Sequence, residues 1–179
     1  MLASRTGRPD AAVQALRTSL ARDAQGSAWV HADLGLALAA LERHPEAIAA
    51  LHDAVQRDPD TAYWRLLLGD ALRMAGRAGE ALAVAERLVA EQPDTAAHWA
   101  LQGRVLVWLD RHAEALPAIE RALQLDARDA TLWSTLVLVQ QNLGQHQQAA
   151  QTVRRLRELD PGRADLVYRS LVLPYEEAR

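Results

Sequence analysis

The chain has 179 residues, a net charge of −3 and no cysteine, and these three features exclude several classes of protein. Its length fits one ordinary domain with a substantial core. The slightly acidic balance argues against a nucleic-acid-binding protein, which needs a broad basic surface. The absence of cysteine excludes disulfides, thiolate nucleophiles and cysteine-based metal sites. Since no apolar run approaches the ~20 residues of a membrane-spanning helix, we expect no direct membrane insertion.

The N-terminal segment, residues 1–27, predicts a single helix over residues 8–24. Residues 7–12 (Gly-Arg-Pro-Asp-Ala-Ala) resemble residues 76–81 (Gly-Arg-Ala-Gly-Glu-Ala), which precede a helix in the middle of the chain. We therefore expect residues 1–27 to form the second half of a repeat whose first helix is missing or vestigial. The start of the chain also lacks the apolar stretch of a secretory signal peptide, so the compartment, cytoplasm or periplasm, stays open.

Residues 28–163 carry an internal repeat with a period of about 34 residues, a length typical of helical-hairpin arrays. The period predicts four units of equal length, at 28–61, 62–95, 96–129 and 130–163. Three columns of residues support it. They are Pro59, Pro93 and Pro161; Gly35, Gly69 and Gly103; and Ala47, Ala81, Ala115 and Ala149.

Each unit has the pattern of two amphipathic helices joined by a short turn. In the second unit, apolar residues recur at helical spacing from Trp64 to Leu72, and residues 75–79 interrupt them. A second apolar series begins at Ala81 and ends before Pro93, which cannot continue a helix. Because the glycine and alanine columns carry almost no side chain, we expect each glycine to pack against the alanine of its own unit, as Gly35 against Ala47.

The remaining residues, 164–179, predict a C-terminal capping helix and a tail. Residues 164–173 begin like the first helix of a fifth unit, and we expect Pro174 to end it. The terminal units of repeat arrays are atypical because one of their faces has no neighbour. A second proline, Pro117, falls inside the second helix of its unit, where it predicts a kink.

The residues of these columns resemble the tetratricopeptide repeat (TPR) family. The resemblance implies an all-α, right-handed α-solenoid of four full repeats, with an N-terminal half-repeat and a C-terminal capping helix. The heavy use of arginine and alanine suggests a bacterial sequence. The residues that carry the resemblance are Leu34, Gly35, Ala47, Leu51, Ala54, Pro59, Trp99 and Trp133.

No pattern of catalytic or cofactor-binding residues accompanies the repeat. The sequence has neither a glycine-rich phosphate loop nor a Gly-x-Ser-x-Gly motif. His44, His112 and His146 occupy equivalent turns, too far apart in a solenoid to share a metal ion. His31 and His98 have no acidic or histidine partner at helical spacing. We therefore expect no enzymatic activity, no metal site and no cofactor.

The TPR resemblance implies a partner-binding groove lined by the first helix of each repeat. Trp64, Trp99 and Trp133 are expected in the core instead. Aromatic residues and arginine are frequent anchors in protein interfaces, and the predicted groove combines them with aliphatic and amide side chains. The predicted groove residues are Trp29, Leu36, Tyr63, Leu66, Asp70, Arg73, Met74, Arg104, Val107, Trp108, Leu138, Gln141 and Asn142.

These observations favour a non-catalytic protein–protein interaction scaffold. Its partner would be a peptide or an amphipathic helix of another protein, within a bacterial secretion, export or envelope assembly. Two alternatives stay open at this point. The array could present substrate to a larger enzyme, such as a glycosyltransferase or sulfotransferase, or it could be a scaffold that self-associates through its end repeats.

Overall fold

The computed structural model describes residues 7–22 and 27–177, which form helices and turns without a strand in those ranges. The predicted all-α fold class is therefore confirmed. The chain divides into two compact units, residues 1–84 and 85–179. Within the described ranges, no helix combines the length and the hydrophobicity needed to cross a membrane.

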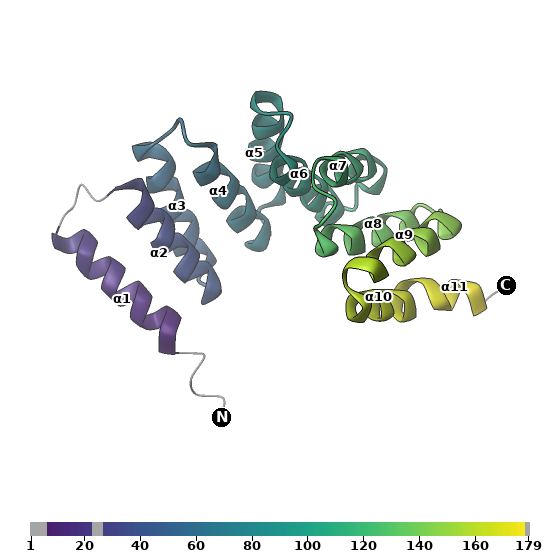
Figure 1. The fold of residues 1–179 in the computed structure, drawn as a ribbon. Helices are drawn as coiled ribbons and strands as arrows, with labels where there is room; N and C mark the ends of the chain where they lie inside the picture. Colours follow the sequence, from purple (N-terminus) through teal and green to yellow (C-terminus); the bar gives the residue numbers. More distant parts are fainter. Residues whose placement is uncertain (1–6, 23–26, 178–179) are drawn as a thin grey trace. The chain divides into compact units, whose positions relative to one another are not determined.

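In its described residues, the first unit contains four helices, and a fifth helix includes the point of division (Figure 1). Helix α1 is predicted over residues 8–24 and observed at Gly7–Arg22; residues 23–24 lie outside the described ranges. Its Val13 is buried against Leu34 and Leu38. The other helices are α2 (Ala28–Ala40), α3 (His44–Arg57), α4 (Ala62–Met74) and α5 (Ala78–Glu91).

The second unit continues the same alternation of helices and ends in a segment that covers the last hairpin. The starts of α2, α4, α6 and α8 are each separated by one full sequence period, and so are the starts of α3, α5, α7 and α9. The backbone thus repeats with the period of the sequence. The elements are α6 (Ala96–Trp108), α7 (His112–Leu125), α8 (Ala130–Asn142), α9 (His146–Leu159), α10 (Pro161–Val167), the π-helical η1 (Tyr168–Val172) and α11 (Leu173–Glu177).

Every hairpin turn uses one residue with left-handed backbone geometry. In the first turn, the N–H of Arg43 donates to the carbonyl of Leu38 at 2.9 Å, and the equivalent bond recurs in the other three turns. This is the Schellman arrangement, which satisfies carbonyls at the end of a helix. The left-handed residues are Glu42 (φ 58°), Gly76 (75°), Asp110 (59°) and Gly144 (73°).

The alanine column lies at the centre of the hairpins, since Ala47, Ala81, Ala115 and Ala149 have no exposed surface. The expected glycine–alanine contact is only partly right. A Cβ on Gly35 would lie 3.2 Å from the carbonyl oxygen of Ala47, but 2.5 Å from Cγ of Leu51. A Cβ on Gly103 would lie 2.6 Å from Cγ1 of Ile119. Thus the glycine makes room mainly for the large residue one helical turn after the alanine.

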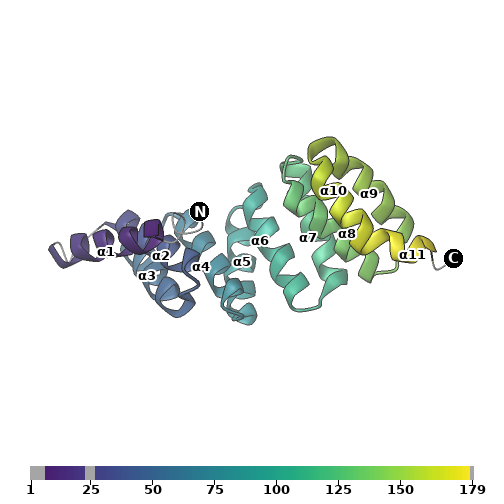
Figure 2. The same cartoon turned by 90° about the horizontal axis from the view of Figure 1, so that it is seen from below.

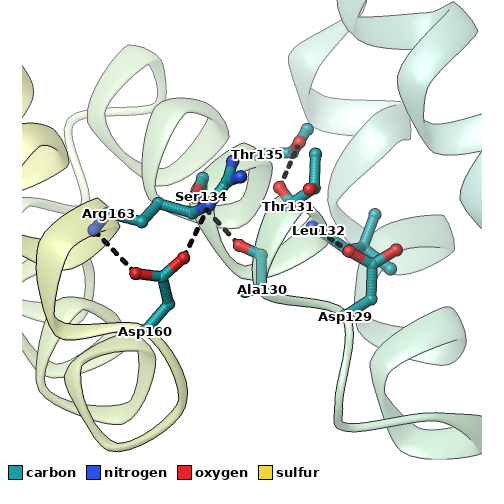
Figure 3. Close-up of polar contacts among 8 residues, drawn as sticks. All are labelled: Asp129, Ala130, Thr131, Leu132, Ser134, Thr135, Asp160 and Arg163. Atoms are coloured by element: carbon teal, nitrogen blue, oxygen red, sulfur yellow. Dashed lines mark hydrogen bonds and ion pairs between the residues drawn. The ribbon is translucent and has the colours of Figure 1, made fainter.

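Two helices of the second unit begin at an aspartate that caps them, as Figure 3 shows. Oδ1 of Asp129 accepts a hydrogen bond from the N–H of Leu132 at 2.9 Å, and Oδ1 of Asp160 accepts one from the N–H of Arg163 at 2.9 Å. Each bond satisfies an amide that the first turn of a helix leaves without a partner. The bonds at Asp160, led by the one from the Arg163 backbone, lower the pKa of that carboxyl group.

The C-terminal segment differs from its prediction. The first helix of this segment begins at Pro161, and Pro174 does not end the helical segment, because helix α11 starts at Leu173 and contains Pro174 as its second residue. A proline is tolerated there, since the first turn of a helix needs no N–H donor. Figure 2 shows α10 beside α9 and α8, and this segment buries Ala164 and Val172. Helix α7 likewise continues through Pro117 as one element.

Candidate functional site

Two first helices of the hairpins, α2 and α6, have a different surface from the second helices. Helices α3, α5, α7 and α9 are clearly amphipathic, and so is the first helix α4, whereas α2 and α6 are apolar around most of their circumference. A helix that is apolar on all sides must be packed against other elements on more than one side to bury its apolar surface. Because hairpin packing covers one side only, large apolar residues of α2 and α6 stay in contact with solvent. These exposed residues, together with their neighbours on the first helices, form the candidate site.

In the first unit, the candidate site lies on the neighbouring helices α2 and α4. Trp29 is 62% exposed, although its ring forms a T-shaped contact with Trp64, with ring centroids 4.5 Å apart. Tyr63 also lies against Trp64, at 5.4 Å. Trp64 is buried, as expected for a core residue, and it supports two exposed aromatic rings of the site. The exposed apolar residues of this unit's site are Trp29, Leu36, Tyr63 and Met74.

The remaining predicted residues of the first unit are partly buried. Leu66 and Asp70 are half-buried, and so is Arg73. Oδ1 of Asp70 accepts a hydrogen bond from Nε of Arg73 at 3.0 Å, an ion pair one helical turn apart. This pair fixes the orientation of the guanidinium group next to Met74. The site on this unit is therefore mostly apolar, with one oriented ion pair.

In the second unit, the candidate site lies on α6 and α8, which also contact each other. Trp108 is 60% exposed at the end of α6, whereas Arg104 and Val107 are half-buried. On α8, Leu138 is half-buried and Asn142 is exposed. Nδ2 of Asn142 donates to the carbonyl of Leu138 at 2.9 Å, which leaves its amide oxygen available to a ligand.

Gln141 does not belong to this exposed surface, contrary to the prediction. Only 5% of it is exposed, and its Oε1 makes a close contact with Nδ1 of His146 at the start of α9. The neighbouring Gln140 is buried too, and its Oε1 accepts a hydrogen bond from Oγ1 of Thr152 at 2.7 Å. Two consecutive glutamines therefore join α8 to α9. Helical spacing within α8 does not show this contact with the next helix.

The charged groups at the start of the second helices are structural. Nε and a terminal guanidinium nitrogen of Arg43, Arg77 and Arg111 contact both carboxylate oxygens of the glutamate three residues later, at 2.6–2.7 Å. Hydrogen bonds from these arginines lower the pKa values of Glu46, Glu80 and Glu114. The repeated pairs occur at the beginning of α3, α5 and α7.

The histidines are distributed as the repeat predicts. His44, His112 and His146 are the first residues of α3, α7 and α9. Nε2 of His112 lies 2.9 Å from Oδ1 of Asp110. Among the residues that the structure describes, no three histidine or acidic side chains gather closely enough to hold a metal ion. The ring of His146 stacks on Tyr175, with centroids 4.5 Å apart.

Successive helical hairpins of equal length, with exposed aromatic residues on their first helices, define a repeat protein of the interaction-scaffold class. The chain belongs to the tetratricopeptide repeat family, whose pattern matches residues 1–51, 32–96, 75–130 and 109–171. No curated protein matches the chain.

Solved structures of other TPR proteins share this fold. MamA (residues 41 to the end) from Desulfovibrio magneticus is 22% identical, with 88% of each chain covered and a TM-score of 0.75. A thermophilic TPR protein from Thermus thermophilus is 21% identical, with 80% of this chain and 82% of that chain covered and a TM-score of 0.71. YrrB, described as a TPR protein with an unusual peptide-binding site, is 21% identical over 93% of this chain and 86% of its own, with a TM-score of 0.65.

Proposed function

We propose that this protein is a non-catalytic scaffold that binds a segment of another protein along the first helices of its repeats. The observation that carries the proposal is the exposure of Trp29 and Trp108 on helices that are apolar around most of their circumference. Exposed apolar surface of this kind marks interaction sites in soluble proteins. Membership of the TPR family supports the same class of function.

The chemistry of the surface suggests the kind of segment that binds. Trp29, Tyr63 and Met74 would receive apolar side chains, and Arg104 adds positive charge on α6. An amphipathic helix, or an extended peptide with apolar side chains and some acidic residues, matches this combination. YrrB, which shares the fold, is likewise described as having a peptide-binding site, and this analogy supports the proposal.

We further propose that the scaffold serves a bacterial assembly, in secretion, export or the cell envelope. The support is the bacterial origin of the MamA and Thermus structures with the same fold. The identity of the bound protein tests this setting, because a partner with no role in such assemblies contradicts it.

The binding surface can be tested in two steps. The wild-type protein first captures partners from an extract of its source organism, and the segment of the captured protein that binds is then titrated calorimetrically. We expect Trp29→Ala and Trp108→Ala each to weaken binding about tenfold, the effect of losing an aromatic anchor. Leu166→Ala is the matched control, since Leu166 is an exposed apolar residue on α10, outside the proposed surface.

Unchanged affinity of both tryptophan variants, with unchanged thermal unfolding, contradicts binding along the first helices. An equal loss in Leu166→Ala instead places the interaction on the C-terminal segment. Circular dichroism melts of all three variants separate loss of binding from loss of folding.

A further inference from the structure

A second surface feature of the protein lies on a different face of α6 from the proposed groove. It is a hollow of about 350 Å³ between α5, α6 and α7, within the unit of residues 85–179. Trp99, Gln102 and Leu106 line it from α6. Their spacing of three and four residues places them on one side of that helix, away from Arg104 and Trp108.

The polar side chains that line this hollow are the carboxylates of Glu86 and Glu114 and the amide of Gln102. Oε1 of Gln102 is buried and accepts no hydrogen bond from the part of the chain that the structure describes. Glu86 makes no hydrogen bond or ion pair within the described residues, and Arg111 is the cation that it attracts at longer range. A buried acceptor without a donor is costly, so a ligand that brings donors would be favoured here.

Pro117 adds a further acceptor. In a regular helix, the N–H of residue 117 would donate to the carbonyl of Ala113, but proline has no N–H. Both Ala113 and Pro117 line the hollow, one helical turn apart on the same side of α7. The Ala113 carbonyl, which points along the helix axis toward Pro117, is thus left without its usual donor at the edge of the hollow.

The nearby cations already have partners. Nε and a terminal nitrogen of Arg111 hold both oxygens of Glu114 at 2.7 Å and 2.6 Å. Arg121 contacts Asp94 at 3.0 Å. These arginines satisfy Glu114 and Asp94, which leaves the carboxylate of Glu86, the amide oxygen of Gln102 and the Ala113 carbonyl for an incoming donor.

Trp99 supplies an aromatic wall to the same hollow. Its indole N–H donates to the carbonyl of Pro93 at 2.6 Å, and this bond fixes the ring. A cation attracted to the face of a tryptophan gains a cation–π interaction. A ligand that combines positive charge, several N–H donors in a plane and a flat stacking surface therefore complements the Glu86 carboxylate, the Gln102 amide oxygen and the Trp99 ring at this hollow.

We propose that this hollow binds the guanidinium group of an arginine side chain from a partner protein. Arginine is preferred to lysine because its planar fork can reach separate acceptors while it stacks on a ring, whereas an ammonium group is a compact point charge. The site is independent of the proposed groove. It gives the scaffold a second contact with its own specificity, for a basic position in a partner.

The probe for this site is N-acetyl-arginine amide, titrated into the full chain and followed by NMR at the indole N–H of Trp99. A Trp99→Phe variant assigns that signal among the five tryptophans. We expect a saturable shift that is at least about threefold weaker with the uncharged citrulline analogue, as the loss of a charge-assisted hydrogen bond predicts. N-acetyl-lysine amide should bind more weakly than the arginine probe.

Glu86→Gln and Glu120→Gln form a matched pair of variants. They remove the same charge from equivalent positions of neighbouring repeats, but only Glu86 lines the hollow. We expect Glu86→Gln to weaken arginine binding about threefold and Glu120→Gln to leave it unchanged. Pro117→Ala, which returns an N–H to the Ala113 carbonyl, should also weaken binding.

Three results would overturn the proposal. They are the absence of a saturable shift at Trp99, equal binding of the citrulline or lysine probe, and equal affinity in Glu86→Gln and the wild type. Since Glu86 is exposed, its substitution leaves the core intact, and an unchanged thermal unfolding curve verifies this.

Discussion

The rings of Trp29 and Trp64 form a T-shaped pair, with the two ring planes at 88° and the centroids 4.5 Å apart. This contact connects the exposed surface of α2 to the buried core of α4. Trp64 thus supports the exposed Trp29 ring of the first unit's candidate site from the core side. The two rings should nevertheless contribute very differently to stability, because one is in solvent and the other is buried.

Alanine substitutions of the two tryptophans test this difference. We expect Trp64→Ala to lower the free energy of unfolding by about 3–5 kcal/mol, as for a buried aromatic residue. Trp29→Ala should cost only about 0.5–1.5 kcal/mol, the value of an aromatic pair. Urea unfolding of both variants measures this, and a larger loss in Trp29→Ala would mean that Trp29 belongs to the core.

The second prediction concerns the effect of Gly35→Ala on stability, which arises from the close contact between Gly35 and Leu51. A Cβ at position 35 would lie 2.5 Å from Cγ of Leu51, and Leu51 is buried, so Gly35→Ala overpacks the hairpin. We expect a loss of about 1–3 kcal/mol in the free energy of unfolding.

A double-mutant cycle checks that the clash is with Leu51. Leu51→Ala alone should cost about 2–5 kcal/mol by leaving a cavity, but it also makes room for the new methyl group. The loss of unfolding free energy in the double variant should therefore be smaller than the sum of the two single losses, by about 1 kcal/mol or more. Simple additivity would place the strain elsewhere, for example at the Ala47 carbonyl.

The sequence predicted the fold well because the signal is local and repeated. Apolar spacing and the proline column depend on the geometry of one hairpin, and four copies of that hairpin reinforce each other. The TPR resemblance implied groove positions for Trp29 and Trp108, and both side chains are exposed. The features that local spacing did not show depend on how separate segments meet. Gln141 is buried in contact with His146 at the start of α9, and Pro174 is the second residue of α11.

The acceptor-rich hollow was also not predicted, although one of its signals was visible. Pro117 stood out in the sequence as a helix interruption, and its missing N–H implied an unsatisfied carbonyl at Ala113. The presence of Gln102 and Ala113 at the same hollow depends on packing between α6 and α7. Residue spacing within one helix cannot predict which residues of two different helices meet.

His31 predicts a pH dependence of stability. It is buried on α2, with Nδ1 3.6 Å from Oδ2 of Asp53 on α3, a partner that spacing within its own helix could not show. Desolvation, and then the charge of Arg57, lower its pKa, while Asp53 opposes them. The unfolded chain therefore binds a proton on His31 more readily than the folded one. Stability should be constant above the unfolded-state pKa and should fall as the pH decreases below it.

The variant His31→Gln isolates this contribution. Urea unfolding of the wild type and the variant at about pH 8 and about pH 5 gives the pH-dependent loss for each protein. We expect a smaller loss in His31→Gln, because glutamine does not titrate. An equal loss in the two proteins would assign the acid sensitivity to other groups.

The four left-handed turn residues give the last prediction, and the chain supplies its own control. Gly76 and Gly79 are three residues apart, and a Cβ on either would meet no atom within 4 Å. They differ in backbone geometry, since Gly76 has a φ of 75° whereas Gly79 lies in α5. Gly76→Ala should lower the free energy of unfolding by about 1–2 kcal/mol, the cost of left-handed geometry for a residue with a Cβ.

Gly79→Ala should instead raise the free energy of unfolding by about 0.5–1 kcal/mol, because alanine loses less backbone entropy than glycine in a helix. By the same reasoning, Glu42→Gly should be neutral or stabilising, since Glu42 occupies the position equivalent to Gly76 and carries a Cβ at a φ of 58°. Thermal and urea unfolding of the three variants measure the signs. A destabilising Glu42→Gly would mean that its side chain contributes more to the turn than its backbone geometry costs.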